Sequence, residues 1–452
     1  MADTLLGQRV DAIRRLARRG HAAPLGKVVA KARPEDIAAV IGHLTAPEQR
    51  LVFSTIKQDA VAADVLSRVH GEDLLHLITD LAPERVATLL GYLPGDDQTD
   101  VIERLPEETR EAVLARMKRD EREEVEELLG YAPDTAGGIM SPTAFTLREN
   151  ITCRDAIAAV QAASDQELIY YAYVENEEGQ LVGVTSLRNL LTHPPSTKLS
   201  DIMSSDVIAV RTETDQEEVA RIAGRYDLLA VPVVDDQRHL VGIVTVDDVI
   251  DVIREEAAED MLLMAGVREP EEEPAGSRLW GPARRLPWLL VTLAGGLGIS
   301  ELIHHFDPLL KSDLVLAGFI PIVMGMEGNV GIQSATVTVR GIATGRIDSA
   351  LGKAVGQEVF NGVVLGMVFA LIIGGYSYVR FQDSRVSLSV AIAVVTGMTS
   401  ASLVGTLVPL TLRRLGVDPA IATGPFVTTA MDGLGLTIYL TTAFLLLGST
   451  GA

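Results

Sequence analysis

After residue 283 this 452-residue chain contains five long apolar stretches, and they constrain its fold more than any other feature. The stretches cover approximately residues 287–306, 314–339, 357–379, 386–411 and 419–448. A helix needs about 20 apolar residues to cross the hydrocarbon core of a bilayer, and each stretch is long enough. Gly, Ala, Ser and Thr are frequent in them, which lets helices pack closely in lipid. Five consecutive segments without a polar face argue against buried helices of a soluble protein, so we predict a five-helix transmembrane domain at 284–452.

Charge is segregated along the chain in the same way. The net charge is −22, but residues 1–283 hold 29 Lys+Arg and 52 Asp+Glu, whereas the remainder holds 10 and 9. An acidic soluble part therefore precedes a nearly neutral membrane part. This excludes a simple soluble enzyme and argues against a nucleic-acid partner, because phosphate binding needs a basic surface. The single cysteine, Cys153, excludes a disulfide framework and a Cys-rich zinc site.

The loops between the stretches predict the orientation. The first residues, MADTLLGQRVDAIRRLARRG, lack the apolar core of a signal peptide, so we expect a cytoplasmic N-terminus. The inner side then carries seven basic residues and the outer side three, as the positive-inside rule requires. The inner residues are Arg284, Arg285, Arg340, Arg346, Lys353, Arg413 and Arg414, and the outer ones are Lys311, Arg380 and Arg385. An odd number of spans places the C-terminus outside the cell (inner) membrane.

Carboxylates within the spans indicate an ion path. Asp432 lies near the middle of the last stretch, and Glu327 lies within the second. A charge at that depth costs at least about 2.5 kcal/mol unless it faces water, a partner or a cation. A hydrogen bond between helices is the alternative for Asp432. Glu301 and Glu358 lie nearer the ends of their stretches, so we expect their side chains to reach the membrane surface.

The residues around Glu327 favour a hard cation. We expect Pro321 to break the helix and Gly325, Gly328 and Gly331 to loosen it, which is tolerated where freed carbonyls line a cavity. Asn329, Gln333 and Ser334 add oxygen ligands on the same stretch. Oxygen ligands without Cys or His suit magnesium or calcium, and the small number of carboxylates suits an ion that keeps its water, as magnesium does.

A repeat with a period of 49 residues organises the N-terminal part. Residues 34–44, PEDIAAVIGHL, recur at 83–93 as PERVATLLGYL. Proline followed by an acid is typical of the first turn of a helix, and the apolar residues have helical spacing. We therefore predict an all-α superhelix over residues 1–130, with an ordinary helical bundle as the alternative.

A second repeat follows at 138–260. Ile139-Met140-Ser141 recurs at residues 202–204, and LVGV at 181–184 recurs as LVGI at 240–243. The β-α-β-β-α order, present twice, resembles a tandem pair of cystathionine β-synthase (CBS) domains, at 131–200 and 201–260. The resemblance implies an adenine nucleotide such as ATP bound between the repeats. The matching ribose-contact pattern is Gly242-x-x-Thr245-x-x-Asp248, whereas the first copy has Asn189 in place of the carboxylate.

An acidic segment connects this pair to the membrane part. Residues 247–273 contain 11 acids, and Asp248, Asp251 and Glu255 share one helical face, where like charges repel. A solvated linker is one reading of the predicted connecting helix, 250–280. The other is a metal-dependent switch, in which divalent ions neutralise the helix and let it pack against another acidic surface such as Asp96-Asp97.

This order of parts resembles the MgtE family of magnesium transporters over nearly the whole chain. The most specific matches are RLPWLL at 285–290, GNVGIQSATVTVRG at 328–341 and DPAIATGPFVTTAMDG at 418–433. The resemblance implies a homodimer with an N-terminal superhelix, a CBS pair, an acidic connecting ("plug") helix and five spans. It departs from the family pattern at Glu327, which stands where the first of two glycines is usual. This adds either a carboxylate near the path or an acid that faces the cytoplasmic vestibule.

The resemblance also implies the site residues. Asp432 corresponds to the pore carboxylate that holds the hydrated ion, and Asn329 with the nearby glycines lines or shapes the path. The cytosolic sensor ligands implied are Asp97, Asp247, Asp248, Asp251, Glu255, Glu256, Glu259 and Asp260. At high cytosolic magnesium, ions would bridge these acidic surfaces and the plug helices would close the pore, and at low magnesium repulsion would open it.

Two other functions fit the sequence. One is the same architecture for another divalent ion, such as cobalt, nickel or calcium. The other is a membrane-anchored adenine-nucleotide sensor without transport. We expect no enzyme, because the sequence contains neither a recognisable nucleophile motif nor a Walker loop, and the membrane potential would then drive ion entry.

Overall fold

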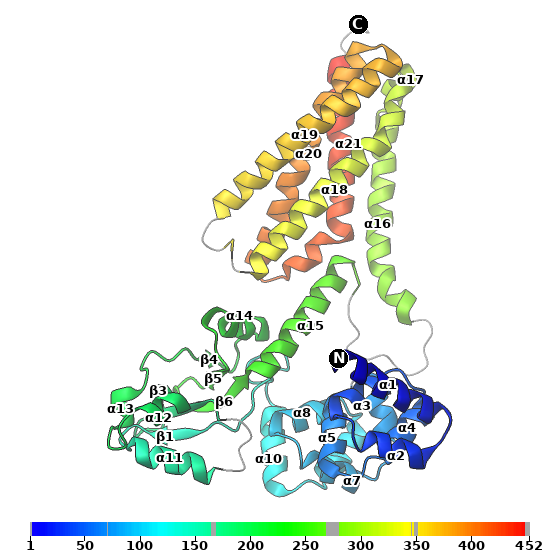
Figure 1. The fold of residues 1–452 in the computed structure, drawn as a ribbon. Helices are drawn as coiled ribbons and strands as arrows, with labels where there is room; N and C mark the ends of the chain where they lie inside the picture. Colours follow the sequence, from blue (N-terminus) through cyan, green and yellow to red (C-terminus); the bar gives the residue numbers. More distant parts are fainter. Residues whose placement is uncertain are drawn as a thin grey trace. The chain divides into compact units, whose positions relative to one another are not determined.

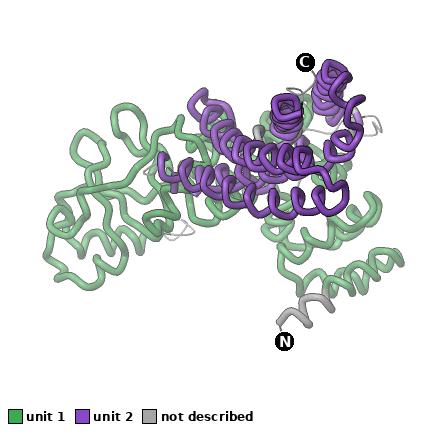
Figure 2. Tube along the Cα trace, turned by 90° about the horizontal axis from the view of Figure 1, so that it is seen from above, with its two compact units in different colours: residues 1–254 green, residues 255–452 purple. Residues whose placement is uncertain are grey.

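A computed structural model describes residues 2–69, 71–163, 169–267, 280–344, 346–347 and 351–447 (Figure 1). The chain forms two compact units, Met1–Arg254 and Glu255–Ala452 (Figure 2). The boundary falls within helix α15, Val246–Met264, which follows the last strand of the first unit. Residues 268–279, which include the end of the predicted acidic connecting segment, lie outside the described residues.

The first unit begins with short helices that stack in two rows. Most of these helices contact the helix two positions further along the chain, as α3 contacts α5 and α4 contacts α6. This pattern confirms the predicted superhelix. The helices are α1 (Ala2–Arg18), α2 (Ala22–Val29), α3 (Pro34–Ile41), α4 (Ala46–Ser54), α5 (Asp59–Ser67), α6 (Gly71–Ile78), α7 (Pro83–Leu90), α8 (Gly95–Glu103), α9 (Glu107–Leu114) and α10 (Arg119–Leu128).

The repeat of 49 residues has a structural cause. Pro34 and Pro83 each begin a helix, where the missing N–H is not needed. The apolar residues that follow are buried at equivalent positions of the two helices, such as Ile37 in α3 and Val86 in α7. Each helix therefore contributes one apolar face to a continuous core.

Two small sheets of identical topology follow. Strands β1 (Thr146–Arg148), β2 (Tyr171–Glu175) and β3 (Leu181–Ser186) form the first, and β4 (Val210–Arg211), β5 (Ala230–Val234) and β6 (Leu240–Thr245) form the second. In each, the first strand is parallel and the third antiparallel to the central strand. The helices of this region are α11 (Cys153–Ala162), α12 (Leu187–Thr192), α13 (Leu199–Ile202) and α14 (Gln216–Tyr226). The predicted α/β repeat is confirmed.

The repeated Ile-Met-Ser segments join the two sheets by exchange. Ser141 of the first copy pairs with Ile243 of β6, and Ser204 of the second copy pairs with Val184 of β3. The backbone N–H groups of Ser141 and Ser204 donate over 2.8 and 2.9 Å respectively. The repeated glycines admit these segments, because a Cβ on Gly242 would lie 2.7 Å from the Ser141 carbonyl oxygen.

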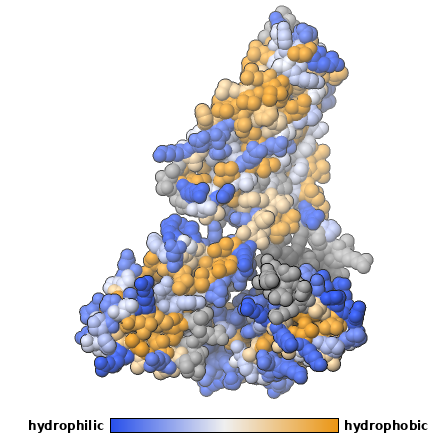
Figure 3. All heavy atoms as spheres, in the orientation of Figure 1, coloured by the Kyte–Doolittle hydropathy of each residue, from blue (hydrophilic) through white to orange (hydrophobic). Residues whose placement is uncertain are grey.

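The second unit contains the predicted membrane domain. Its helices are α16 (Trp280–His305), α17 (Asp307–Ser312), α18 (Val315–Ala343), α19 (Leu351–Phe381), α20 (Ser384–Arg414), the 3₁₀ helix η1 (Pro419–Thr423) and α21 (Pro425–Leu447). Five described segments are long and apolar enough to cross a membrane: Arg285–His305, Val315–Ala343, Leu351–Phe381, Ser384–Arg414 and Val427–Leu447. Apolar side chains cover much of the outer surface of these helices in Figure 3, as lipid contact requires.

The expected break at Pro321 is wrong, because α18 continues through this residue. Pro321 lies in the second turn of the helix and removes one N–H donor, which leaves the Ala317 carbonyl without its usual partner. Nearby helices and side chains compensate for such a loss in membrane proteins. Here the Tyr439 hydroxyl on α21 donates to the neighbouring Leu316 carbonyl over 2.8 Å.

Candidate cation path and cytoplasmic acidic sites

The predicted path residues lie on two different faces of helix α18. Gly325, Asn329 and Gln333 are exposed and recur at intervals of four, so they share one face of the helix. Glu327 and Gly331 point the opposite way and are buried. The structure therefore separates Glu327 from Asn329, although the two residues are close in sequence.

Glu327 lies in a slot made by two glycines. Its carboxylate fills the positions that a Cβ on Gly397 of α20 and a Cβ on Gly435 of α21 would occupy. Its residue surface is 1% exposed, and neither carboxylate oxygen has a hydrogen-bond partner among the described residues. Glycine at both positions is thus what allows a carboxylate into the contact between α18, α20 and α21.

Asp432 lies on α21 beside the same contact and is half-buried. Its nearest glycine on α18 is Gly328, where a Cβ would be 3.7 Å from the Asp432 Oδ1 atom. Close approach of the helices is helped by Gly331, which faces Met431, and by Gly405, which faces the Gly331 carbonyl. Of the predicted pore glycines, Gly331 therefore acts by letting α18 and α21 meet, whereas a Cβ on Gly325 would lie in open space.

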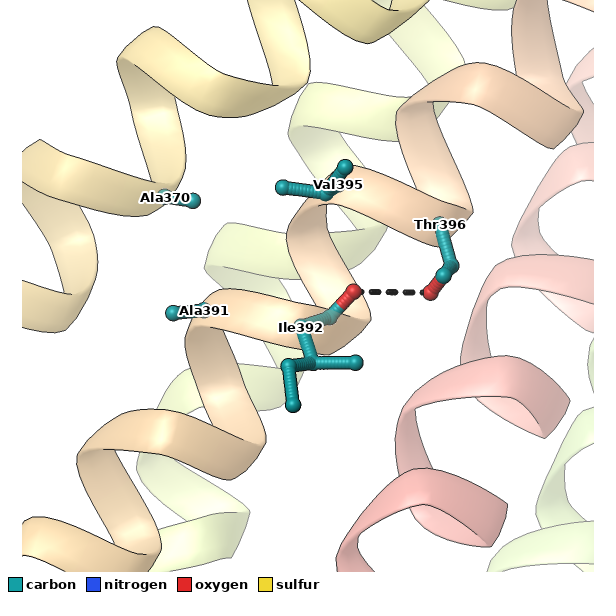
Figure 4. Close-up of a pocket in the computed structure, with 5 residues that line it drawn as sticks. All are labelled: Ala370, Ala391, Ile392, Val395 and Thr396. Carbon is teal, nitrogen blue, oxygen red and sulfur yellow. Dashed lines mark hydrogen bonds between the residues drawn. The ribbon is translucent and has the colours of Figure 1, made fainter.

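An apolar groove between α19 and α20 does not belong to this path. Its volume is ≈ 260 Å³, and it is lined by Ala370, Ala391, Ile392, Val395 and Thr396 (Figure 4). The hydroxyl of Thr396 donates to the Ile392 carbonyl of its own helix over 2.8 Å. The groove thus offers a cation no oxygen that is not already bonded within α20.

Glu358 departs from the expectation that it reaches the membrane surface. Its carboxylate accepts hydrogen bonds from Ser334 of α18 over 2.8 Å and from Asn361 over 3.1 Å. Ser402 of α20 donates to the Glu358 carbonyl over 2.6 Å and lies 3.0 Å from the Ser334 hydroxyl. The residue joins α18, α19 and α20 through polar contacts because Gly362, one turn further on, lets α19 approach α20 closely.

In the first unit, acids from two elements come together. Asp96 and Asp97 lie in the first turn of α8, and Asp248 lies in the first turn of α15. Burial, followed by the charge of Asp248, raises the pKa of Asp96 to about 7. Burial also raises the pKa values of Asp97 and Asp248 to about 6, with further contributions from Asp100 and Asp247 respectively. One oxygen of Asp96 is buried without a hydrogen-bond partner in the described part of the chain.

The other predicted sensor acids are distributed along α15. Asp247, Asp251, Glu255 and Glu259 are exposed, and Glu256 is half-buried. Asp251 accepts a hydrogen bond from Arg254 over 3.2 Å. In the described ranges no three His, Cys, Asp or Glu side chains converge as ligands of one ion. A bound ion would thus need water for much of its coordination.

The end of α15 brings another pair of acids together in the second unit. Leu263 packs with Val339 of α18 and Ala420 of η1, and Gly424 admits the backbone of residues 263–266. Burial, followed by the charge of Asp418, raises the pKa of Asp260. Asp418 also accepts a hydrogen bond from the Ala420 N–H over 2.7 Å.

The predicted nucleotide residues have a local structural role. Asp248 accepts hydrogen bonds from the backbone N–H and the hydroxyl of Thr245, which closes the first turn of α15. In the first copy, Ser186 accepts from the Asn189 N–H over 3.2 Å at the start of α12. Both copies therefore use this pattern to begin a helix after the third strand.

Sequence reasoning did not identify Asp418 or the contacts of Glu358. The signal for Asp418 was an acid directly before a proline at the beginning of the last apolar stretch. Asp96 was recognised only as part of a surface, because nothing local distinguishes it from Asp97. Two partners of Glu358 are distant in sequence: Ser334 precedes it by 24 residues and Ser402 follows it by 44. No local sequence pattern points to either of them.

Comparison with known proteins agrees with these features. Residues 320–442 match the family model described as a divalent cation transporter, residues 32–134 match the MgtE intracellular N domain, and residues 199–255 match the CBS domain. The fold and its intramembrane carboxylates define a multi-pass membrane protein of the divalent cation transporter class.

The chain belongs to the MgtE family. It is 37% identical over 437 residues to the magnesium transporter MgtE of Thermus thermophilus, covering 95% of this chain and 96% of the relative. The magnesium transporter MgtE of Bacillus subtilis is 33% identical over 435 residues, with the same coverage. That of Enterococcus faecalis is 40% identical over 326 residues, covering 72% of each chain.

A solved structure supports the fold of the first unit. The crystal structure of the cytosolic domain of the Mg²⁺ channel MgtE in complex with ATP matches with a TM-score of 0.50 and 37% identity. The match covers 54% of this chain and 99% of that chain.

Proposed function

We propose that this chain carries Mg²⁺ across the cell (inner) membrane along a path that includes Asp432 and the exposed face of α18. The observation that carries the proposal is an exposed stripe on a membrane helix, formed by Gly325 and the amide side chains of Asn329 and Gln333. The half-buried carboxylate of Asp432 lies by Gly328, the residue before Asn329. Exposed polar groups at this depth must face water or a partner. The names of the curated relatives support magnesium as the ion.

The chemistry of the stripe suits a hydrated cation. Amide oxygens and one carboxylate can hold an ion through its waters, and Mg²⁺ releases water reluctantly. No ATP hydrolysis is needed, because the membrane potential supplies about 2.3 kcal/mol per elementary charge for each 100 mV. A divalent ion gains twice this amount.

Acidic residues meet other acids near both ends of α15, and this arrangement suits closure of the ion path by magnesium. Asp96, Asp97 and Asp248 repel one another when ionised, as do Asp260 and Asp418. Cytosolic Mg²⁺ that bridges such pairs stabilises the packed state, so the ion closes the path only by preferring that state. The end of α15 packs on α18 and η1, which suits it as the closing element.

The exposed stripe also supports a homodimer. A second copy related by a twofold axis would cover the stripe on α18. The stripes of the two copies would then lie around one ion path. We place the N-terminus in the cytoplasm and the C-terminus outside, in agreement with five spans and the basic inner loops.

ATP or another adenine nucleotide is a second proposed ligand, at Thr245 and Asp248. The support is the ATP named for the related cytosolic domain. We expect Asp248→Asn to weaken ATP binding at least about tenfold, or about 1.4 kcal/mol, in calorimetry of the full-length protein. The matched control is Asn189→Ala at the equivalent position of the first copy, which should bind as the wild type does.

Magnesium uptake into proteoliposomes tests the main proposal. Uptake should require Asp432, fall with Asp432→Asn and decrease as magnesium on the cytoplasmic side rises. Glu301→Gln is the control, because it removes an exposed charge from α16 of the same domain. If cobalt, nickel or calcium competes with magnesium for uptake and is itself taken up in preference, the transported ion is a different one. Folded protein that binds nucleotide tightly but gives no flux would identify the anchored sensor instead.

A further inference from the structure

When it is ionised, Glu327 needs a positive partner that the described protein does not supply. Its residue surface is 1% exposed, and both carboxylate oxygens are buried without a hydrogen-bond donor in the ranges described above. An ionised carboxylate that is buried without compensation costs several kcal/mol. The two glycines that accommodate it, Gly397 and Gly435, contribute no side chain. Their lack of a side chain is what leaves room for the Glu327 carboxylate.

Asp432 is the nearest candidate to share a cation with Glu327. One oxygen of Glu327 occupies the Cβ position of Gly435, and Asp432 precedes Gly435 by three residues on α21. Positions three apart on a helix are neighbours, with Cβ atoms about 5–6 Å apart. Asp432 also faces Gly328, the residue next to Glu327. The two carboxylates thus approach the same α18–α21 contact from opposite helices.

We propose that Glu327 and Asp432 together bind one divalent cation by direct coordination, at a site that Asn329 does not reach. This inference rests on the proposed transport function and names an ion preference for it. Two carboxylates favour a cation that exchanges water for protein oxygen more readily than Mg²⁺ does, and Mn²⁺ suits such ligands. Glu327 is therefore a specificity-determining residue that strengthens Mn²⁺ binding relative to a path with Asp432 alone.

Electron paramagnetic resonance of Mn²⁺ titrated into the full-length protein in detergent tests the site without transport. We expect Glu327→Gln to bind one Mn²⁺ fewer per chain than the wild type. Glu358→Gln is the matched control, because it neutralises another membrane carboxylate that already has Ser334 and Asn361 as partners. An unchanged number of bound ions in Glu327→Gln overturns the inference.

Asp432→Asn provides a second, independent variant. If both carboxylates hold the same ion, Asp432→Asn and the double variant each lose that one Mn²⁺ and no more. Loss of two ions in the double variant overturns the shared site. If glutamine does not fit between Gly397 and Gly435, the variant Glu327→Gly removes the same carboxylate. It should lose the same Mn²⁺ ion.

Flux separates this inference from the proposed function. Glu327→Gln should raise the Mn²⁺ concentration that half-inhibits Mg²⁺ uptake at least about tenfold. If the wild-type protein shows no Mg²⁺ uptake, the proposed transport function is wrong. The number of bound Mn²⁺ ions then still tests the site formed by Glu327 and Asp432. Normal Mg²⁺ uptake with identical Mn²⁺ inhibition in both proteins would remove only the site.

Discussion

Single residues decide whether a carboxylate can lie inside this membrane domain. Gly397 and Gly435 are the residues against which Glu327 packs, and a Cβ at either one would overlap its carboxylate. Their role is therefore steric, and it differs from that of a helical glycine with open space around it, such as Gly375.

We predict that Gly397→Ala destabilises the protein by about 1–3 kcal/mol, the usual cost of overpacking. Gly375→Ala is the control and should be neutral or slightly stabilising, because alanine favours helix. Thermal unfolding in detergent measures both. Adding Glu327→Gly to Gly397→Ala should restore stability, and failure to do so would mean that the added methyl group clashes with something other than Glu327.

The acids of α8 make the first unit sensitive to pH. The pKa of Asp96 is raised to about 7 in the folded protein, so its neutral form is favoured there. The resulting stabilisation is complete below the ordinary pKa of an aspartate and is lost as the pH rises to about 7. Divalent ions should replace the proton above this range.

Without divalent ions, we therefore predict that hydrogen exchange in α8 becomes severalfold faster when the pH is raised from about 5 to about 8, after correction for the intrinsic rate. Mg²⁺ should slow this exchange much more at the higher pH. Asp96→Asn should reduce the pH effect, whereas Asp120→Asn, an exposed acid on α10, should not. Equal protection by Mg²⁺ at both pH values would contradict the prediction.

At the scale of elements, local patterns were sufficient for much of the fold. The apolar stretches predicted the membrane helices, and the repeats predicted the superhelix and both sheets, because periodicity reflects which face of an element is buried. Pro321 misled the prediction because it lies near the start of α18, which continues through it, and because the contact beside it comes from α21: the hydroxyl of Tyr439, 118 residues away, donates to the Leu316 carbonyl. The direction of Glu327 likewise depends on glycines in two distant helices, and no local pattern contains that information.

The polar contacts between α18, α19 and α20 give a prediction for Glu358. Glu358→Gln retains an acceptor for the Ser334 hydroxyl, so its stability should be close to that of the wild type. Glu358→Ala removes the acceptor of the Asn361 amide and leaves the Ser334 hydroxyl with only the Ser402 hydroxyl as a neighbour, at a cost of about 1–3 kcal/mol. Thermal unfolding distinguishes the two variants, with Glu301→Ala on α16 as the control. Equal loss in the Gln and Ala variants would show that charge, not hydrogen bonding, matters here.

The contact between the end of α15 and η1 predicts how Asp418 acts. Asp418→Asn keeps an acceptor for the Ala420 N–H but removes the charge that faces Asp260. Because repulsion then no longer opposes packing of α15, uptake at low cytoplasmic magnesium should fall at least about twofold and depend less on that magnesium. Proteoliposome flux measures this, and an unchanged magnesium response would exclude Asp418 from the closure.

For the whole molecule, the distribution of charge predicts an effect of removing magnesium. Residues 1–283 carry 23 more acids than bases, so their compact state is opposed by self-repulsion. Chelation of divalent ions should increase cleavage of this part by protease several-fold. Sodium chloride at equal ionic strength should protect less than magnesium, because screening does not bridge carboxylates. Equal protection by both salts would contradict a specific role for bound ions.

The exchange of Ile-Met-Ser segments between the two sheets has a consequence for synthesis on the ribosome. Each sheet is completed by a segment that precedes the other copy, at Ser141 for β6 and at Ser204 for β3. The first copy thus remains unfinished until residue 204 has left the exit tunnel, and the segment at Ser141 waits still longer for β6. Neither half completes its own sheet within the described residues, so we expect the two copies to fold as one unit.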